Sequence, residues 1–143
     1  MDDALDTLVF KIQNEIHEQT RQEFGQEFFE RWTNPRHMGV VQDASTEASL
    51  TGSCGDEITI FLNIAEDRVI RAGFVTTGCG PSIVCADVAC ELAEGCDLET
   101  AAAMEGSDIL EIVPRIPEDK QHCAHLASRS LREAIRGYWE KTS

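Results

Sequence analysis

The sequence predicts an α+β domain in which a small three-stranded antiparallel sheet packs against helices, with long helices near both ends. Three observations support this fold class. The first segment has helical apolar periodicity, two β-rich runs separated by a short turn follow it, and the remainder is helical again. The chain has 143 residues, of which 42% are hydrophobic, and this is the ordinary size of one domain with one core. We therefore expect residues 1–143 to form a single domain.

The first segment of the chain is predicted to be a helix with one apolar stripe. The stripe comprises Leu5, Leu8, Val9, Ile12 and Ile16, and Phe24, Phe28 and Trp32 continue it. Gly25 interrupts this pattern and is either a break or a weak point in the helix. We expect the helix to end near Thr33, because Asn34 precedes Pro35 and the residue before a proline disfavours the helical conformation.

Two β-rich runs occupy the middle of the chain, after a loop-like polar stretch. They cover residues 58–64 and 69–77, and only the turn-forming residues 65–68 lie between them. We therefore expect the runs to pair as an antiparallel hairpin. Residues 48–53 are a weaker candidate for the third strand of the sheet.

The rest of the chain is predicted to be helical. Pro81 fits the first turn of a helix that runs to about residue 94, with Gly95 as the residue after its end. Shorter helical segments are expected over residues 98–104 and 108–113. Pro117 and the two acidic residues after it are expected to open the last long helix. The buried face of that helix is expected to comprise Leu126, Leu131, Ala134, Ile135 and Tyr138.

The charge of the chain excludes several classes of partner. With 26 acidic and 12 basic residues the net charge is −14, and no Lys or Arg cluster suited to phosphate groups appears, so we expect neither nucleic acid nor anionic membrane as a partner. The acidity provides solubility, or alternatively attracts cations or a basic protein. No apolar run has the length of a membrane span and the acidic N-terminus does not resemble a signal peptide, which predicts a cytoplasmic protein.

Three of the six cysteines lie where predicted elements meet. In a reducing compartment, cysteines are more often metal ligands or reactive thiols than disulfides. Cys54 opens a turn between strands with Asp56 beside it, and Cys79 lies between a strand and a helix. Cys123 follows His122 and is expected in the second turn of the last helix. Cys79 is expected at a helix N-terminus, where unpaired N–H groups favour the thiolate.

These five side chains are one more donor than a tetrahedral ion needs, which suits a site that exchanges ligands. Each residue also has a plainer interpretation, since an isolated cysteine is usually a small buried hydrophobe and a single histidine is usually a surface residue. The spacing is not that of a zinc finger. The residues alone therefore indicate only a candidate metal site.

Four motifs together resemble the IscU/NifU-type iron–sulfur cluster scaffolds. They are Asn-Pro-Arg-His-Met-Gly at 34–39, Cys-Gly-Asp at 54–56, Thr-Gly-Cys-Gly at 77–80 and Lys-Gln-His-Cys at 120–123. They occur in the order of that family and at close to its spacing, over about residues 22–141. The resemblance implies an α+β fold with a three-stranded sheet and a site exposed at one end, and it makes residues 1–21 an N-terminal helical extension.

The resemblance also implies an assembly scaffold and carrier that is not a turnover enzyme. The implied ligands are Cys54, Asp56, Cys79, His122 and Cys123. The three cysteines would accept persulfide sulfur from a cysteine desulfurase, bind iron and hold a transient 2Fe–2S or 4Fe–4S cluster that passes to acceptor apo-proteins; zinc would be an alternative occupant. Asp56 would labilise the cluster, and Lys120 would lie near the site. The protein is expected to be a monomer or a homodimer.

Several features depart from the family pattern. The chaperone-recognition motif of the family, Leu-Pro-Pro-Val-Lys, corresponds to Ile-Pro-Glu-Asp-Lys at 116–120, so a dedicated Hsp70-type chaperone is not an expected partner. The N-terminal extension is expected to add packing, with a dimer or partner surface as the alternative. Cys85 and Cys90 are expected in the core, and Cys96 is expected to be exposed.

Two other functions fit parts of the pattern. The first is a zinc-bound sulfurtransferase of SufU type, which accepts sulfur from a desulfurase without housing a cluster. Such chains carry an insertion between the second and third cysteines and lack the histidine before the last one, whereas His122 is present here and 43 residues separate Cys79 from Cys123. The second is a structural zinc domain used for interaction.

Overall fold

A computed structural model shows the predicted α+β architecture and describes residues 2–78 and 80–142. Its sheet consists of β1 (Thr46–Thr51), β2 (Glu57–Ala65) and β3 (Arg68–Thr76). The strands lie in the order β1-β2-β3 and both pairings are antiparallel. The predicted fold class and the β2–β3 hairpin are therefore confirmed, and the weaker third run is the edge strand β1.

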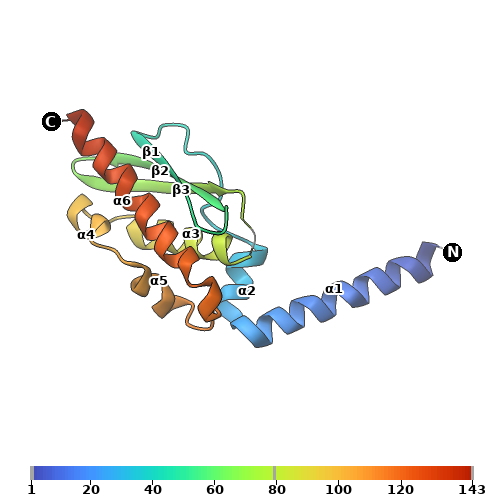
Figure 1. The fold of residues 1–143 in the computed structure, drawn as a ribbon. Helices are drawn as coiled ribbons and strands as arrows, with labels where there is room; N and C mark the ends of the chain where they lie inside the picture. Colours follow the sequence, from blue (N-terminus) through green and yellow to red (C-terminus); the bar gives the residue numbers. More distant parts are fainter. Residues whose placement is uncertain (1, 79, 143) are drawn as a thin grey trace.

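The helices flank the sheet on one side and at one end (Figure 1). They are α1 (Asp2–Phe24), α2 (Gln26–Thr33), α3 (Gly80–Ala93), α4 (Leu98–Ala102), α5 (Gly106–Ile112) and α6 (His122–Thr142), with a 3-10 turn over Glu118–Lys120. Helices α3 and α6 pack against each other and against the sheet. In the part of the chain that the structure describes, no helix combines the length and apolarity that crossing a membrane requires.

The core lies between the inner face of the sheet and α3 and α6. Alternate residues of β2 point inward, as the period of two in a strand requires, and Ile58, Ile60 and Leu62 are completely buried. The predicted inner residues of α6 are buried except Tyr138, which packs at the edge of the core. Cys85 and Cys90 of α3 are also completely buried, which confirms that they are core residues.

The outer edge of β3 is closed by hydrogen bonds from segments outside the sheet. Phe74 accepts from the N–H of Gly39 at 2.7 Å and donates to the carbonyl of His37 at 3.0 Å. The backbone approaches so closely here that a Cβ on Gly73 would lie 2.7 Å from the carbonyl oxygen of Gly39 and 2.9 Å from Val41 Cγ2. An edge closed in this way cannot pair with a strand of another chain.

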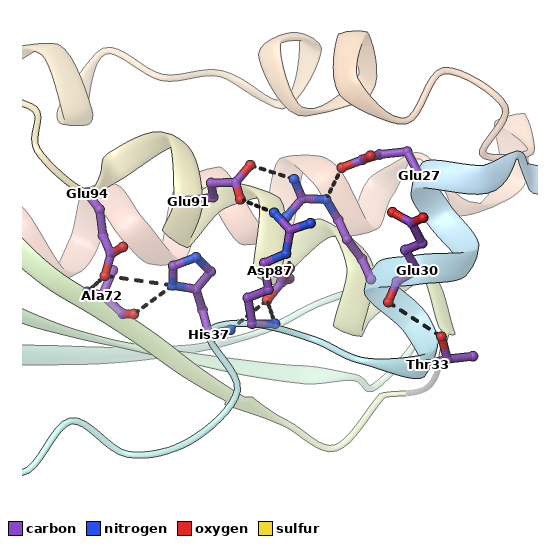
Figure 2. A network of polar contacts seen from close by, with 10 residues as sticks. Glu27, Glu30, Thr33, His37, Ala72, Asp87, Glu91 and Glu94 are labelled. Atoms are coloured by element: carbon purple, nitrogen blue, oxygen red, sulfur yellow. Dashed lines mark hydrogen bonds and ion pairs between the residues drawn. The ribbon is translucent and has the colours of Figure 1, made fainter.

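A buried ion-pair network fixes this edge segment to α3 (Figure 2). The Asp87 carboxylate accepts hydrogen bonds from Arg31 Nη1 and from the N–H groups of Arg36 and His37, each at 2.8 Å. Arg31 also donates to Glu91 at 2.5 Å and to a glutamate of its own helix. The segment at 34–39 is the first of the four family motifs. Its described contacts join α2, α3 and β3, so they stabilise the fold.

The prediction of a helix at the N-terminus is correct. The expectation that the N-terminal extension adds packing is wrong. The helix breaks at Gly25, whose φ of +94° is one that glycine adopts without strain, and α2 ends at Thr33 as predicted. The stripe from Leu5 to Ile16 is exposed along its whole length, so it does not add to the packing of the core. Figure 1 shows α1 extending away from the rest of the molecule.

The start of the last helix also differs from the prediction. Pro117 opens only the short 3-10 turn, in which the N–H of Lys120 donates to the carbonyl of Pro117 at 2.8 Å. The helix α6 begins at His122. A proline suits the first positions of an α-helix and of a 3-10 helix equally, because the backbone N–H groups at these positions have no partner within the helix and proline has no N–H. Cys123 consequently lies in the first turn of α6 and not in the second.

Candidate metal centre

Cys54 is presented by the tight turn between β1 and β2. The N–H of Gly52 donates to the carbonyl of Asp56 at 2.8 Å, and the N–H of Gly55 donates to the carbonyl of Gly52 at 3.0 Å. Gly55 has a φ of +91°, which explains the glycine after the cysteine. The turn leaves the Cys54 side chain exposed, and its sulfur is therefore accessible to a partner.

The first turn of α6 brings two further donors to Cys54. His122 Nε2 lies 3.0 Å from Cys54 Sγ and 3.7 Å from Cys123 Sγ. An ion with bonds of about 2.3 Å to sulfur and about 2.0 Å to nitrogen holds tetrahedral S and N ligands about 3.5 Å apart. The separation to Cys123 fits that value, and the shorter one to Cys54 is a hydrogen bond that a bound ion would replace.

Asp56 joins this cluster through Ser82, a residue that the sequence did not single out. Ser82 Oγ donates to Asp56 Oδ2 at 2.9 Å and lies 3.5 Å from Cys123 Sγ. Its side chain is buried, with 1% exposed, in the first turn of α3. A Cβ at Gly78 would collide with both Ser82 and Asp56, so the glycine before Cys79 makes room for this contact.

The environment of Cys123 favours its thiol form. Burial raises the pKa of the Cys123 thiol, and only 2% of the residue is exposed. The hydrogen bond with Ser82 lowers this pKa, whereas the charges of Cys54 and Asp56 raise it further. The Lys120 ammonium lowers it and has the smallest of these effects. Cys123 must lose its proton before it can bind a metal, so loading this ligand becomes easier as the pH rises.

The predicted donors are thus brought together unequally. His122 contacts both Cys54 and Cys123, and Ser82 links the Asp56 carboxylate to the Cys123 sulfur. Cys79 lies outside the described residues. Among the side chains that are described, no three His, Cys, Asp or Glu already stand as a complete metal-binding group. The hydroxyl group of Ser82 engages only one oxygen of the Asp56 carboxylate, and an ion bound between His122 and Cys54 would replace their hydrogen bond.

Two polar residues were missed at the sequence level, and each had a usable signal. Ser82 follows the Thr-Gly-Cys-Gly motif directly after Pro81, in the first turn of the helix that this proline was expected to open. Asp87 is a carboxylate in a helix that is otherwise almost entirely apolar, and charged residues are rarely buried unless they are paired. The position of Ser82 indicates a role in the candidate site, and the lone carboxylate of Asp87 indicates the buried ion-pair network.

The remaining cysteines do not belong to this centre. Burial raises the pKa of both Cys85 and Cys90, and neither thiol is exposed, so both are unreactive core residues. Cys96 was predicted to be exposed and is half-buried, because it packs against the edge of the core. Its thiol donates to the carbonyl of Leu92 at 3.1 Å.

Comparisons with known proteins agree with the fold and with the family resemblance. A family model described as the NifU-like N terminal domain matches residues 23–143. The "Iron-sulfur cluster assembly scaffold protein IscU 1" of Archaeoglobus fulgidus is 31% identical over 119 residues, which are 82% of this chain and 78% of that protein.

Two solved structures have the same fold. The N-terminal part of a nitrogen-fixing NifU-like protein from Brucella abortus matches with a TM-score of 0.68 at 15% identity, over 85% of this chain and 97% of that one. A putative iron–sulfur cluster assembly scaffold protein for the SUF system from Fervidobacterium islandicum AW-1 matches with a TM-score of 0.66 at 17% identity, over 81% and 98%. From its motifs, its fold and the match over residues 23–143, the chain belongs to the NifU-like N-terminal domain family.

Proposed function

We propose that this protein is a scaffold on which iron–sulfur clusters are assembled and from which they are transferred to acceptor proteins. The observation that carries the proposal is the contact of His122 with both Cys54 and Cys123, with Asp56 linked to Cys123 through Ser82. Thiolate and imidazole groups are the ligands that cluster iron takes in proteins. Membership of the NifU-like N-terminal domain family and the names of the similar proteins support the same function.

In this proposal the exposed Cys54 is the first group that a sulfur donor reaches. Its thiolate attacks the terminal sulfur of a persulfide on a cysteine desulfurase; the donor S–S bond breaks, and the donor cysteine leaves as a thiolate. Cys123 is almost completely buried, so it serves mainly as an iron ligand. Cys79 is the third thiolate of the proposed ligand set, and the cargo is a 2Fe–2S or 4Fe–4S cluster.

Asp56 gives the proposed site its capacity to release the cluster, and His122 is an alternative ligand. A carboxylate is a harder and poorer ligand for cluster iron than a thiolate. Because Ser82 holds Asp56 close to Cys123, the carboxylate is available to replace a sulfur ligand. Lys120 acts on the site through its charge. The proposed setting is the cytoplasm, with acceptor apo-proteins as partners and without a dedicated Hsp70-type chaperone.

Anaerobic reconstitution tests the proposal. The protein is incubated with ferrous iron, cysteine, a thiol reductant and a cysteine desulfurase. The expected result is the visible absorption of an iron–sulfur cluster bound to the protein. When an apo-ferredoxin is added, the cluster should leave this protein and appear on the ferredoxin. Tightly held zinc together with a protein persulfide, and no cluster, would contradict the scaffold function and identify a zinc sulfurtransferase of SufU type.

A further inference from the structure

The N-terminal half of α1 carries an apolar stripe that no part of the described chain covers. The stripe comprises Leu5, Leu8, Val9, Ile12 and Ile16, with exposed fractions from 45% to 62%. The helix projects from the body of the domain along this half (Figure 1). Exposed apolar residues that are scattered singly are normal, whereas a continuous row of them marks an interaction site.

The stripe is not the face by which α1 contacts its own domain. His17 and Arg21 lie against the ring of Phe29, with centroid distances of 5.5 and 4.2 Å, and Phe24 stacks on Phe28 at 4.6 Å. At about 100° per residue, this docking face is rotated by roughly 100–160° from the stripe around the helix axis. The body of the same chain therefore cannot cover the stripe without a rotation of α1.

We propose that the stripe pairs with the α1 stripe of a second copy of this chain, in an antiparallel arrangement. Leu5, Val9, Ile12 and Ile16 are spaced by four, three and four residues, and this spacing is the same in both directions. In an antiparallel pair, Leu5 therefore lies opposite Ile16 of the second copy, and Val9 lies opposite Ile12. Such a two-fold contact uses the same surface on both copies and closes on itself.

The charges of the chain favour the antiparallel direction. Each copy carries a net charge of −14, and a parallel pair would place both acidic bodies at the same end of the helices. The antiparallel pair places them at opposite ends. Along its two flanks, Asp6 faces Gln13 of the second copy and Leu8 faces Glu15, so no acidic side chain opposes another one there.

The expected association is weak and linked to the order of α1. The apolar contact covers residues 5–16, about 17 Å of helix at 1.5 Å per residue, which is less than a stable interface normally uses. Dissociation constants in the micromolar to millimolar range follow from so short a contact. A helix of this length standing alone in water is marginal, so helical content should rise as the copies associate.

Sedimentation velocity over a range of protein concentrations tests the proposal, with Ile12→Glu as the disrupting variant. The two-fold symmetry places two altered side chains in each dimer, so we expect the dissociation constant to rise about 100-fold, tenfold for each buried charge. Phe10→Glu is the matched control, because Phe10 is 63% exposed on the same helix but lies roughly 140° from Leu5 around the axis. It should associate like the unaltered chain. Monomers at every concentration up to about 1 mM, the upper end of the expected dissociation constants, or equal loss in both variants, would overturn the proposal.

Mixing two charged variants tests the direction. Leu5→Lys and Ile16→Glu should each associate poorly alone. Their mixture should associate well, because only an antiparallel pair places the new lysine opposite the new glutamate. A mixture that remains as weak as either variant would overturn the antiparallel arrangement. Added salt should leave the association of the unaltered chain unchanged or strengthen it, because salt screens the repulsion between the acidic bodies.

Discussion

Replacing Asp87 by alanine should destabilise the protein more than any surface substitution. Asp87 is completely buried, and the side chain of its partner Arg31 is 3% exposed. The substitution leaves the guanidinium with its two glutamate partners but removes the acceptor shared by the N–H groups of Arg36 and His37. Removing one partner of a buried ion pair costs about 3–5 kcal/mol, and each buried N–H left without an acceptor costs about 1–3 kcal/mol.

Both costs are incurred only in part, because Arg31 keeps two glutamate partners and water can reach the part-buried N–H groups. The expected total loss is therefore about 3–5 kcal/mol. Total stabilities of single domains are about 5–15 kcal/mol. Urea unfolding followed by circular dichroism measures the change. Glu99→Ala, at an exposed position of α4, is the control and should stay within about 0.5 kcal/mol.

Hydrogen exchange adds a local measurement to this prediction. The amide of Gly39 donates to the carbonyl of Phe74, and the Asp87 network holds the segment that carries it. In Asp87→Ala this amide should lose protection before the amides in the centre of β2 do. A loss of stability below about 1 kcal/mol, or an unchanged exchange rate at Gly39, would refute the idea that Asp87 positions this segment.

Two further predictions test the close backbone approach and the candidate site. Gly73→Ala places a Cβ 2.7 Å from the carbonyl oxygen of Gly39 and should lower the free energy of unfolding by about 1–3 kcal/mol in thermal or urea unfolding. Gly137→Ala is the control in α6, where the new Cβ would have only an ordinary contact at 3.4 Å. It should raise the free energy of unfolding by about 0.5–1 kcal/mol. Because burial raises the pKa of Cys123, its thiolate fraction is below that of a free cysteine at neutral pH. Its alkylation, followed by mass spectrometry, should therefore rise with pH through a midpoint above that of a free thiol, and a midpoint below it would contradict the burial of this residue.

Local patterns in the sequence were sufficient for most of the fold. The β-rich runs at residues 58–64 and 69–77 predicted β2 and β3, and the proline and glycine signals at residues 81 and 95 predicted α3, because these elements follow from local rules. The start of α6 was placed at Pro117 and lies at His122, because a proline can open a 3-10 turn as well as an α-helix. The N-terminal stripe showed helical periodicity, but periodicity does not state what covers an apolar face.

The candidate site could be predicted in its residue types and only partly in its geometry. The junction positions of Cys54 and Cys123 and the presence of His122 followed from the motifs. The hydrogen bond of Ser82 to Asp56 joins residues 26 positions apart, and such a contact depends on how β2 and α3 pack. Tertiary packing, which no local pattern encodes, also sets the burial and the raised pKa of Cys123.

The most direct test of the account is the amount of iron and sulfide bound per chain after anaerobic reconstitution and gel filtration of Cys123→Ser. The account predicts that this variant loses most of the bound cluster while keeping the circular dichroism of the unaltered protein. Cys96→Ser is the matched control, because Cys96 is half-buried and lies outside the site, and it should retain the cluster. Full retention by Cys123→Ser, or equal loss by Cys96→Ser, would contradict the assignment of Cys54, His122 and Cys123 as one metal centre.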